Sequence, residues 1–378
     1  MRKMLVFSDW YEPGFKAGGP IRSSVYFVDA LKRSYDIFVF TRNTDLNSSL
    51  PYEGIISDLW VQMEGYKIFY CSQSKLKMSL VSGTIRNIKP DIIYLNGMFS
   101  PYFSVLPLLF RKLATPATVM VIAPRGMLKK SALAYKEFKK KIFLSVFKLF
   151  DIYNNIVFQA TNSKEILEVK EVIGKSANVV LLPNFTYRIP GRITSINKFP
   201  GSLRLIYAAR IHPIKNLDFI IRILFKIKGN IELTIVGSIE DKDYWSRCHD
   251  LIQQLPFNIH VKIIGELSHQ NVLLEIVNSH LMCLPSSGEN FGHGIFESLA
   301  LGRPVLISDQ TPWLELENWG AGWDINLSRP DLFEEAINLF LNLNQQEFNN
   351  MSEKAWLLAK SFDSNTSLIS EYQRMFNY

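Results

Sequence analysis

"SSGENFGHGIFESLALGRP" (residues 286–304) places two carboxylates, Glu289 and Glu297, around a glycine-rich turn that leads into an apolar helical segment. Such turns usually recruit phosphate, because the N–H groups at a helix start are unpaired and the helix dipole is positive there. Two carboxylates would repel phosphate alone. The stretch therefore indicates a ligand that also carries hydroxyl groups, as a sugar nucleotide does.

The composition is that of a large globular protein. The chain has 378 residues, 47% of them hydrophobic, which is enough for two domains. The first apolar run ends at Ser8, so it predicts a core strand rather than a signal peptide, and no apolar run approaches the roughly 18 residues of a membrane span. The three cysteines are far apart and predict neither disulfides nor a zinc site: Cys71, Cys248 and Cys283. We expect a cytoplasmic protein.

Strand-like and helical segments alternate twice along the chain. The expected strands of the first half are 3–9, 35–42, 90–97, 117–126 and 154–161. An irregular segment follows, and the alternation restarts in strands 203–210, 231–238, 260–267, 280–287 and 304–309. This pattern predicts an α/β fold of two Rossmann-like domains, with parallel sheets facing a central cleft. The expected divisions are an acceptor-binding domain at 1–186, a donor-binding domain at 187–360, and a C-terminal helix at 361–378 that packs back on the first.

Two further motifs follow predicted strands. Gly18 and Gly19 precede Pro20, which suits the first turn of a helix, and they would let a ligand approach the backbone closely. Arg210 ends the first strand of the second half, and Lys215 follows five positions later, just before or in the first turn of a helix that starts near Asn216. Two cations at this edge could neutralise a departing diphosphate. The alternatives are a structural loop for the glycines and a solvated charge pair for the cations.

The local structure around the two carboxylates can also be predicted. We expect the helix to begin near Ile295, which places Glu297 in its first turn, and we expect Glu289 to be exposed at the mouth of the cleft. The acidic residues of 241–243 could suggest a divalent metal, but a solvated loop or a helix start is the better interpretation.

Positive charge is concentrated in the first half. The whole chain carries +7, whereas residues 1–186 hold 25 Lys and Arg against 14 Asp and Glu. Within it, the segment 129–150 combines lysines with an apolar side, as helices that lie on anionic lipid do. The alternative is an ordinary surface helix that packs on the sheet.

Taken in order, these motifs resemble the retaining, nucleotide-sugar-dependent glycosyltransferases of family 4, which have the GT-B fold. The resemblance rests on the Gly18-Gly19 loop, the Pro183-Asn184 pair, the Arg-x4-Lys pair, and the Glu-x7-Glu spacing followed by "ALGRPVLISD". It implies that Arg210, Lys215 and Glu289 form the catalytic centre, with the two cations stabilising the leaving diphosphate and neither cofactor nor metal required. The donor-binding residues that it implies are Gly18, Gly19, Leu267, Asn290, Phe291, Gly292 and Glu297, with Glu297 on the ribose and Leu267 near the base.

The acceptor side departs from the family pattern. Many relatives carry a histidine after the strand that corresponds to 117–126, whereas this chain has Arg125 and Gly126. An arginine cannot serve as a base at neutral pH, so we expect Arg125 to bind an acceptor phosphate, with Gly126 beside it. The alternative is that Arg125 binds the donor. "SDWYEPGFKAGGPIRS" and "APRG" resemble the branch that assembles bacterial surface polysaccharides.

The resemblance implies transfer of a hexosyl unit to a lipid-linked saccharide in O-antigen, capsule or exopolysaccharide synthesis. The expected partners are the nucleotide sugar, the saccharide acceptor and an anionic membrane surface contacted by 129–150, with no nucleic acid. The expected place is the inner face of the cytoplasmic membrane. Two alternatives remain open: an epimerase or phosphorylase of similar fold, and a non-catalytic basic protein that binds membrane.

Overall fold

The computed structural model describes residues 1–114, 117–129, 132–133, 140, 143–145, 153, 155–362 and 365–377. The chain divides into two compact units, one made of Met1–Phe185 with Asn365–Tyr378 and the other of Thr186–Ser364. Among the described residues, no helix has both the length and the apolar character needed to cross a membrane. Most of the segment 129–150, for which we predicted a basic amphipathic helix, lies outside the described residues.

The first unit is built on an eight-stranded sheet of order β3-β4-β2-β1-β5-β6-β7-β8. All its pairings are parallel except that of β3 with β4. Its strands are β1 (Lys3–Ser8), β2 (Asp36–Arg42), β3 (Trp60–Met63), β4 (Tyr66–Cys71), β5 (Ile92–Asn96), β6 (Val119–Ala123), β7 (Ile156–Ala160) and β8 (Asn178–Leu181).

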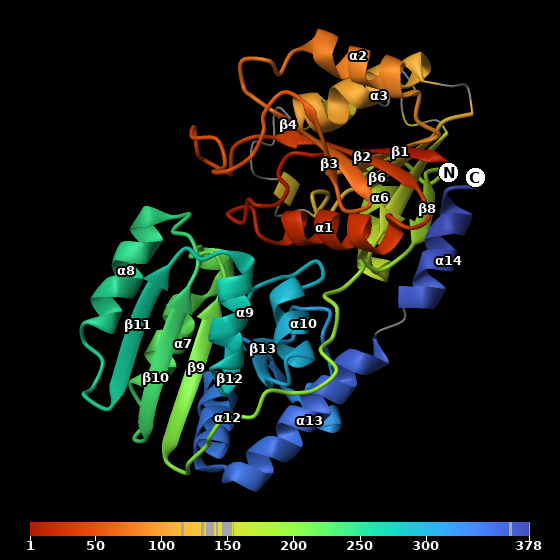
Figure 1. Cartoon of the computed structure of the whole chain (residues 1–378). Coiled ribbons are helices and arrows are strands. Elements are labelled where there is room, and N and C mark those ends of the chain that lie inside the picture. The colour runs from red at the N-terminus through yellow and green to blue at the C-terminus, as the bar shows by residue number, and fades with distance from the viewer. Residues whose placement is uncertain are drawn as a thin grey trace. The chain divides into compact units, whose positions relative to one another are not determined.

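Helices cover both faces of this sheet, so its central strands are apolar on both sides (Figure 1). In β1, Leu5 and Phe7 belong to one buried core, while Met4 and Val6 belong to a second core on the opposite face. The second core includes residues of α1 and α14, which contact each other. The helices are α1 (Gly19–Leu31), α2 (Met78–Ile88), α3 (Leu106–Phe110), α6 (Ser163–Val172) and α14 (Asn365–Met375), with η1 (Pro101–Val105) and η2 (Arg111–Leu113) between α2 and β6.

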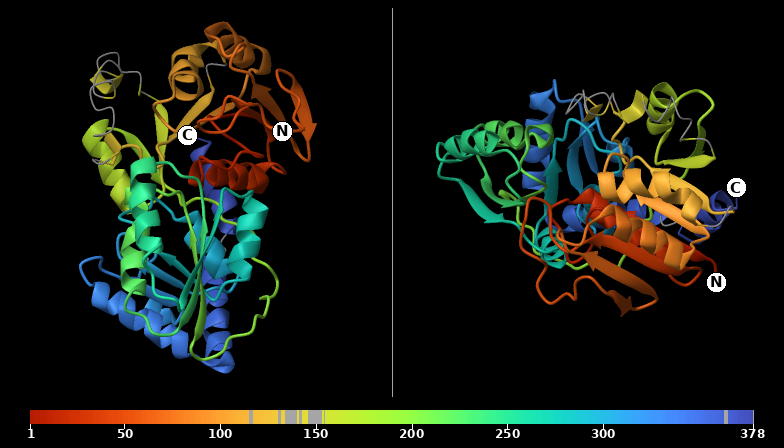
Figure 2. Two further views of the ribbon diagram at one scale, coloured as in Figure 1. Left: turned by 90° about the vertical axis from the view of Figure 1, so that its left-hand side faces the viewer. Right: turned by 90° about the horizontal axis from the view of Figure 1, so that it is seen from above.

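The second unit has a six-stranded, fully parallel sheet of order β11-β10-β9-β12-β13-β14, flanked by helices (Figure 2). Its strands are β9 (Ser202–Ala208), β10 (Asn230–Val236), β11 (Ile259–Gly265), β12 (Leu281–Leu284), β13 (Val305–Ser308) and β14 (Gly322–Ile325). Its helices are η3 (Pro213–Lys215), α7 (Leu217–Leu224), α8 (Lys242–Ile252), α9 (His269–Val277), α10 (His293–Ala300), α11 (Leu316–Trp319), α12 (Pro330–Asn342) and α13 (Gln345–Ser361).

The predicted strands all form, and the prediction of two parallel-sheet, Rossmann-like domains is confirmed. Four strands had no counterpart in the prediction: β3, β4, β8 and β14. β3 and β8 contain no fully buried residue, so they lack the continuous apolar run that marks a central strand. β14 has only four residues, and one of them is Asp324.

Candidate functional site

The candidate donor site lies where the strand order of the second sheet reverses. From β9 the chain runs outward through β10 to β11 and then returns to place β12 on the other side of β9. Ligands of such sheets bind outside the carboxyl ends of the strands at this reversal. The loops that leave β9 and β12 there are 209–216 and 285–292, which contain the predicted Arg210, Lys215 and Glu289.

Hydrogen bonds hold these two loops together. Asn216, in the left-handed region at a φ of 51°, donates from Nδ2 to the Pro285 carbonyl at 2.7 Å and to Ser287 Oγ at 2.8 Å. The Ser287 N–H donates to the Ile214 carbonyl at 2.7 Å. As a result, Lys215 Nζ lies 2.5 Å from Glu289 Oε1. Glu289 was expected to be exposed, but only 13% of its side chain is, because the loop contact encloses it.

Arg210 is held by a second close contact between backbones. Gly237 has a φ of 148°, and a Cβ on it would lie 1.9 Å from the Ala209 carbonyl oxygen, so only glycine fits there. This contact brings the loops after β9 and β10 together, and Arg210 Nη1 lies 2.5 Å from Glu240 Oε2. Both predicted cations therefore lie at the same sheet edge, each beside a carboxylate.

The glycine-rich turn leads into α10 two residues earlier than we predicted. Gly292 caps the helix at a φ of 78°, and α10 starts at His293, so Glu297 lies in the second turn rather than the first. The helix dipole at the first turn therefore does not account for Glu297. Trp313 Nε1 donates to the Phe291 carbonyl at 2.6 Å and fixes the turn itself.

Glu297 has a partner that the sequence did not indicate. His269, the first residue of α9, places Nε2 3.0 Å from Glu297 Oε1, and the Glu297 side chain is only 5% exposed. The Tyr187 ring lies edge-on to the His269 ring at 6.4 Å. Leu267, expected near the base, packs partly buried against the core of the unit. The sequence signal that could have indicated this pair is the position of His269 at the start of a helix that follows a strand.

In the first unit, the predicted glycines lie at a helix start. Gly18 caps α1 at a φ of 63°, Pro20 lies in the first turn as predicted, and a Cβ on Gly18 or Gly19 would meet no atom within 4 Å. The backbone is therefore open to close approach at this point. Asp45 Oδ2 accepts from the N–H groups of Phe15 and Lys16, which fixes the preceding loop.

Arg125 has a φ of 56° and is bound by neutral groups of its own unit. Its guanidinium donates to Asn96 Oδ1 at 2.8 Å, to the Tyr94 hydroxyl at 2.7 Å, and to Asn184 Oδ1. The Gly126 N–H donates to Glu165 at 2.6 Å. These bonds join the ends of β5 and β6 to the "PN" pair, so both residues shape the edge of the first sheet.

A polar network at that edge was missed by sequence reasoning. Asp9, which follows β1, accepts from Ser100 Oγ at 2.7 Å and pairs with Arg42 Nη2 at 3.3 Å. Arg42 Nη1 also donates to Gln73 Oε1 at 3.2 Å. Burial raises the pKa of the Asp9 carboxyl, although the bonds from Ser100 and Arg42 oppose the rise. The sequence signal that could have indicated this network is Asp9, an acidic residue directly after the buried strand β1. It lies at the reversal of the strand order between β1 and β5.

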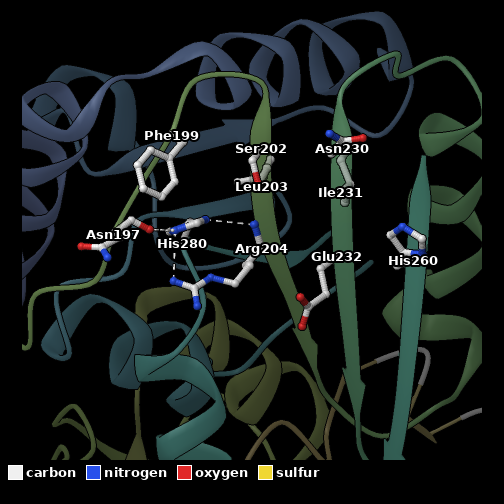
Figure 3. A pocket seen from close by; sticks show the side chains of 10 residues that line it. All are labelled: Asn197, Phe199, Ser202, Leu203, Arg204, Asn230, Ile231, Glu232, His260 and His280. Atoms are coloured by element: carbon white, nitrogen blue, oxygen red, sulfur yellow. Dashed lines mark hydrogen bonds between the residues drawn. The ribbon is translucent and has the colours of Figure 1, made fainter.

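A cavity of about 330 Å³ lies at the opposite end of the second sheet, beside the first residues of β9 and β10 (Figure 3). His280 in its wall accepts at Nδ1 from the Arg204 N–H at 2.9 Å, so Nε2, at 2.7 Å from the Asn197 carbonyl, carries the proton. Burial lowers the pKa of His280 to about 4. This histidine anchors the chain before β9 and is remote from the carboxyl-end loops. Asp241 caps α8, so of the two interpretations the segment is a helix start, and the described residues contain no cluster suited to a metal ion.

Comparison with known proteins matches part of the chain to one family. Residues 193–356, which include the loops after β9 and β12, match the family model described as Glycosyl transferases group 1. The matched segment lies within the second unit. The chain is 27% identical over 114 residues to an uncharacterized glycosyltransferase of Methanocaldococcus jannaschii. That match spans 30% of the chain and only 28% of the relative's length.

Solved structures of similar fold match this chain over almost all of its length. Sucrose-phosphate synthase from Thermosynechococcus elongatus has a TM-score of 0.70 at 15% identity, covering 100% of this chain and 98% of the other. Anabaena HepE in complex with UDP-glucose has a TM-score of 0.70 at 16% identity, covering 99% of each chain. At such identities the likeness establishes the GT-B fold and nothing finer.

Proposed function

We propose that this protein transfers a hexosyl unit from a nucleoside-diphosphate sugar to a hydroxyl of a saccharide acceptor, with retention of the anomeric configuration. The observation that carries the proposal is the Lys215–Glu289 pair at the strand reversal of the second sheet, inside the segment that matches the family model. HepE, a structural relative, was solved with UDP-glucose, so UDP-glucose is the first donor to test.

Lys215 and Arg210 act on the leaving group. An ammonium has three N–H donors and a guanidinium has five, so each cation keeps its carboxylate partner and still donates to a phosphate oxygen. In the reaction, the bond between the sugar C1 and the phosphate oxygen breaks, and its electron pair leaves with the diphosphate. The acceptor oxygen bonds to C1 on the same face, and its proton passes to the leaving phosphate oxygen. Positive charge fixed beside that phosphate lowers the barrier, and no metal is required.

The remaining donor-binding residues each bind a different part of the nucleotide sugar. Glu289 and the backbone of Asn290, Phe291 and Gly292 hold the transferred sugar and the diphosphate. Glu297 accepts hydrogen bonds from the ribose hydroxyls, and the base lies near Leu267. We also propose that Gly18 and Gly19 of the first unit bind the donor through their backbone, which the open space beside it supports.

We place the acceptor on the first unit, at the carboxyl edge of its sheet. Arg125 and Gly126 shape this edge, and the Asp9 network offers carboxylate, guanidinium and hydroxyl groups that suit a saccharide. We propose a lipid-linked saccharide of bacterial surface-polysaccharide synthesis as the acceptor, and the inner face of the cytoplasmic membrane as the place. The excess of positive charge in residues 1–186 supports attachment to anionic lipid through 129–150.

The test is incubation of the purified protein with radiolabelled UDP-glucose and other sugar nucleotides, in EDTA, with and without membrane extract. We expect label in a lipid-extractable product only when extract is present, and an α-linked product from an α-linked donor. An epimerase would instead convert the donor sugar without extract, and a phosphorylase would require free phosphate. A non-catalytic basic protein would leave every donor unchanged. Each of these three outcomes would refute transfer to a lipid-linked acceptor.

A further inference from the structure

The contact between His269 and Glu297 joins the starts of two helices beside the strand reversal. His269 is the first residue of α9, and Glu297 lies in the second turn of α10. Their side chains are 19% and 5% exposed, and Nε2 and Oε1 are 3.0 Å apart. We propose that His269 positions the Glu297 carboxylate for the ribose hydroxyls, and so determines the preference for ribonucleotides over deoxyribonucleotides. This inference rests on the proposed function.

A carboxylate as buried as Glu297 is costly unless hydrogen bonds compensate it. An imidazole N–H that donates to a carboxylate oxygen supplies such a bond and fixes the orientation of the group. A carboxylate has about four lone-pair sites, so the bond from His269 leaves acceptor capacity for hydroxyl groups. Hydrogen bonds to ribose hydroxyls depend on the orientation of the carboxylate. A carboxylate that is already fixed makes these bonds without the entropy cost of ordering its side chain when the ligand binds.

His269 is itself held on a second side. The half-buried Tyr187 packs against the core of the unit and presents its ring to the imidazole at an angle of 77°. Burial raises the pKa of the Tyr187 phenol, and the negative charge of Glu297 raises it further. Three segments of the second unit thus meet at this point: the chain before β9, the start of α9 and the second turn of α10.

A purely structural role would make a different prediction. If the contact only fastens α9 to α10, its loss weakens the fold and reduces the affinity for every nucleotide by the same factor. If His269 orients the carboxylate, loss of His269 lowers the affinity for ribonucleotides and has little effect on the affinity for nucleotides that lack the hydroxyl. The ratio of the two affinities therefore separates the roles, even in a variant of lower stability.

The experiment is calorimetric titration of UDP, 2′-deoxy-UDP and 3′-deoxy-UDP into the full-length protein, with GDP and its deoxy forms as a second set. In His269→Leu we expect the affinity for the ribonucleotide to fall about tenfold, while that for at least one deoxy form changes less than about twofold. His269→Gln, whose amide can donate to Glu297, should restore most of the preference. His249→Leu, on the exposed side of α8, should change neither affinity.

Equal losses for ribo and deoxy forms in His269→Leu would overturn the inference and leave the proposed function intact. Failure of the wild-type protein to bind any of UDP, GDP and ADP would instead refute the proposed function, and the inference with it. If His269→Leu does not fold, the same ratio measured in His269→Phe, whose ring fills the place of the imidazole but cannot donate to Glu297, decides. A wild-type protein that binds the ribo and both deoxy forms equally would also overturn the inference.

Discussion

Lys215 and Glu289 form an ion pair in which both side chains are 13% exposed, with 2.5 Å between Nζ and Oε1. They are far apart in the sequence and meet because the loops after β9 and β12 are joined through Asn216. A partly desolvated ammonium at the strand reversal is a preorganised site for a diphosphate, since its position is fixed before the ligand arrives.

Replacing Lys215 by Met should abolish most of the transfer activity. We expect kcat/KM to fall by roughly 10²- to 10³-fold, the loss seen when one preorganised donor to developing charge is removed. Steady-state kinetics with the labelled donor measure this. Lys226→Met, which removes the more exposed Lys226–Glu334 pair of the same unit, is the control and should leave the rate unchanged. Equal rates in Lys215→Met and wild type would remove Lys215 from the mechanism.

Gly237→Ala should destabilise the second unit, because the new Cβ would lie 1.9 Å from a backbone oxygen at a φ of 148°. We expect a loss of more than about 3 kcal/mol in the free energy of unfolding, from the clash and the unfavourable φ together. Gly174→Ala is matched in φ, at 144°, but has no atom within 4 Å, so it should cost only about 1–2 kcal/mol. Urea unfolding compares the two, and equal losses would contradict the account.

Trp313→Phe should weaken donor binding without abolishing it. The substitution removes the bond to the Phe291 carbonyl and loosens the glycine-rich turn. A loss of about 1 kcal/mol corresponds to a roughly fivefold higher Kd. Trp356→Phe removes a similar indole bond, to the Pro190 carbonyl at 3.0 Å, and should affect stability but not donor affinity. Titration of UDP into both variants is the measurement, and an unchanged Kd in Trp313→Phe would count against a role for the turn.

Acid should destabilise the second unit through His280. Its pKa is lowered to about 4 in the fold, whereas an unfolded histidine has a pKa near 6.5. The unfolded chain therefore takes up the proton first. The contribution of His280 is fully present above about pH 6.5, and up to about 3 kcal/mol is lost as the pH falls toward 4. Thermal unfolding from pH 4 to 7 should show a flatter acid limb in His280→Gln than in wild type. His249→Gln should retain the steeper limb.

Much of the fold could be predicted because central parallel strands leave a plain signal. β1 is buried on both faces, and its sequence is accordingly a nearly continuous apolar run. β3 has no such run, because it is an exposed strand at the edge of its sheet. The helix after the glycine-rich turn was placed too late because Gly294 suggested the turn itself. In the structure Gly294 lies within α10. A Cβ on Gly294 would lie 3.4 Å from Met282 Cε, so the glycine allows α10 to pack closely against β12.

The sequence indicated which candidate residues share a sheet edge, but not which of them pair. Strand ends indicate which side chains share a sheet edge, so Arg210, Lys215 and Glu289 could be placed together from the sequence. The carboxylate that each cation pairs with, Glu240 for Arg210 and Glu289 for Lys215, depends on the paths of loops and on side-chain rotamers. The pair of His269 with Glu297 has the same origin, because it depends on how two helix starts pack against each other.

The most direct test of the central claim is calorimetric titration of UDP, GDP and ADP, in EDTA, into the wild-type protein, Lys215→Met and Glu297→Ala. We predict that one of the diphosphates binds the wild-type protein at a single site and loses at least tenfold in affinity in each variant. If none of the diphosphates binds, or if both variants bind as tightly as wild type, the account of the donor site is wrong.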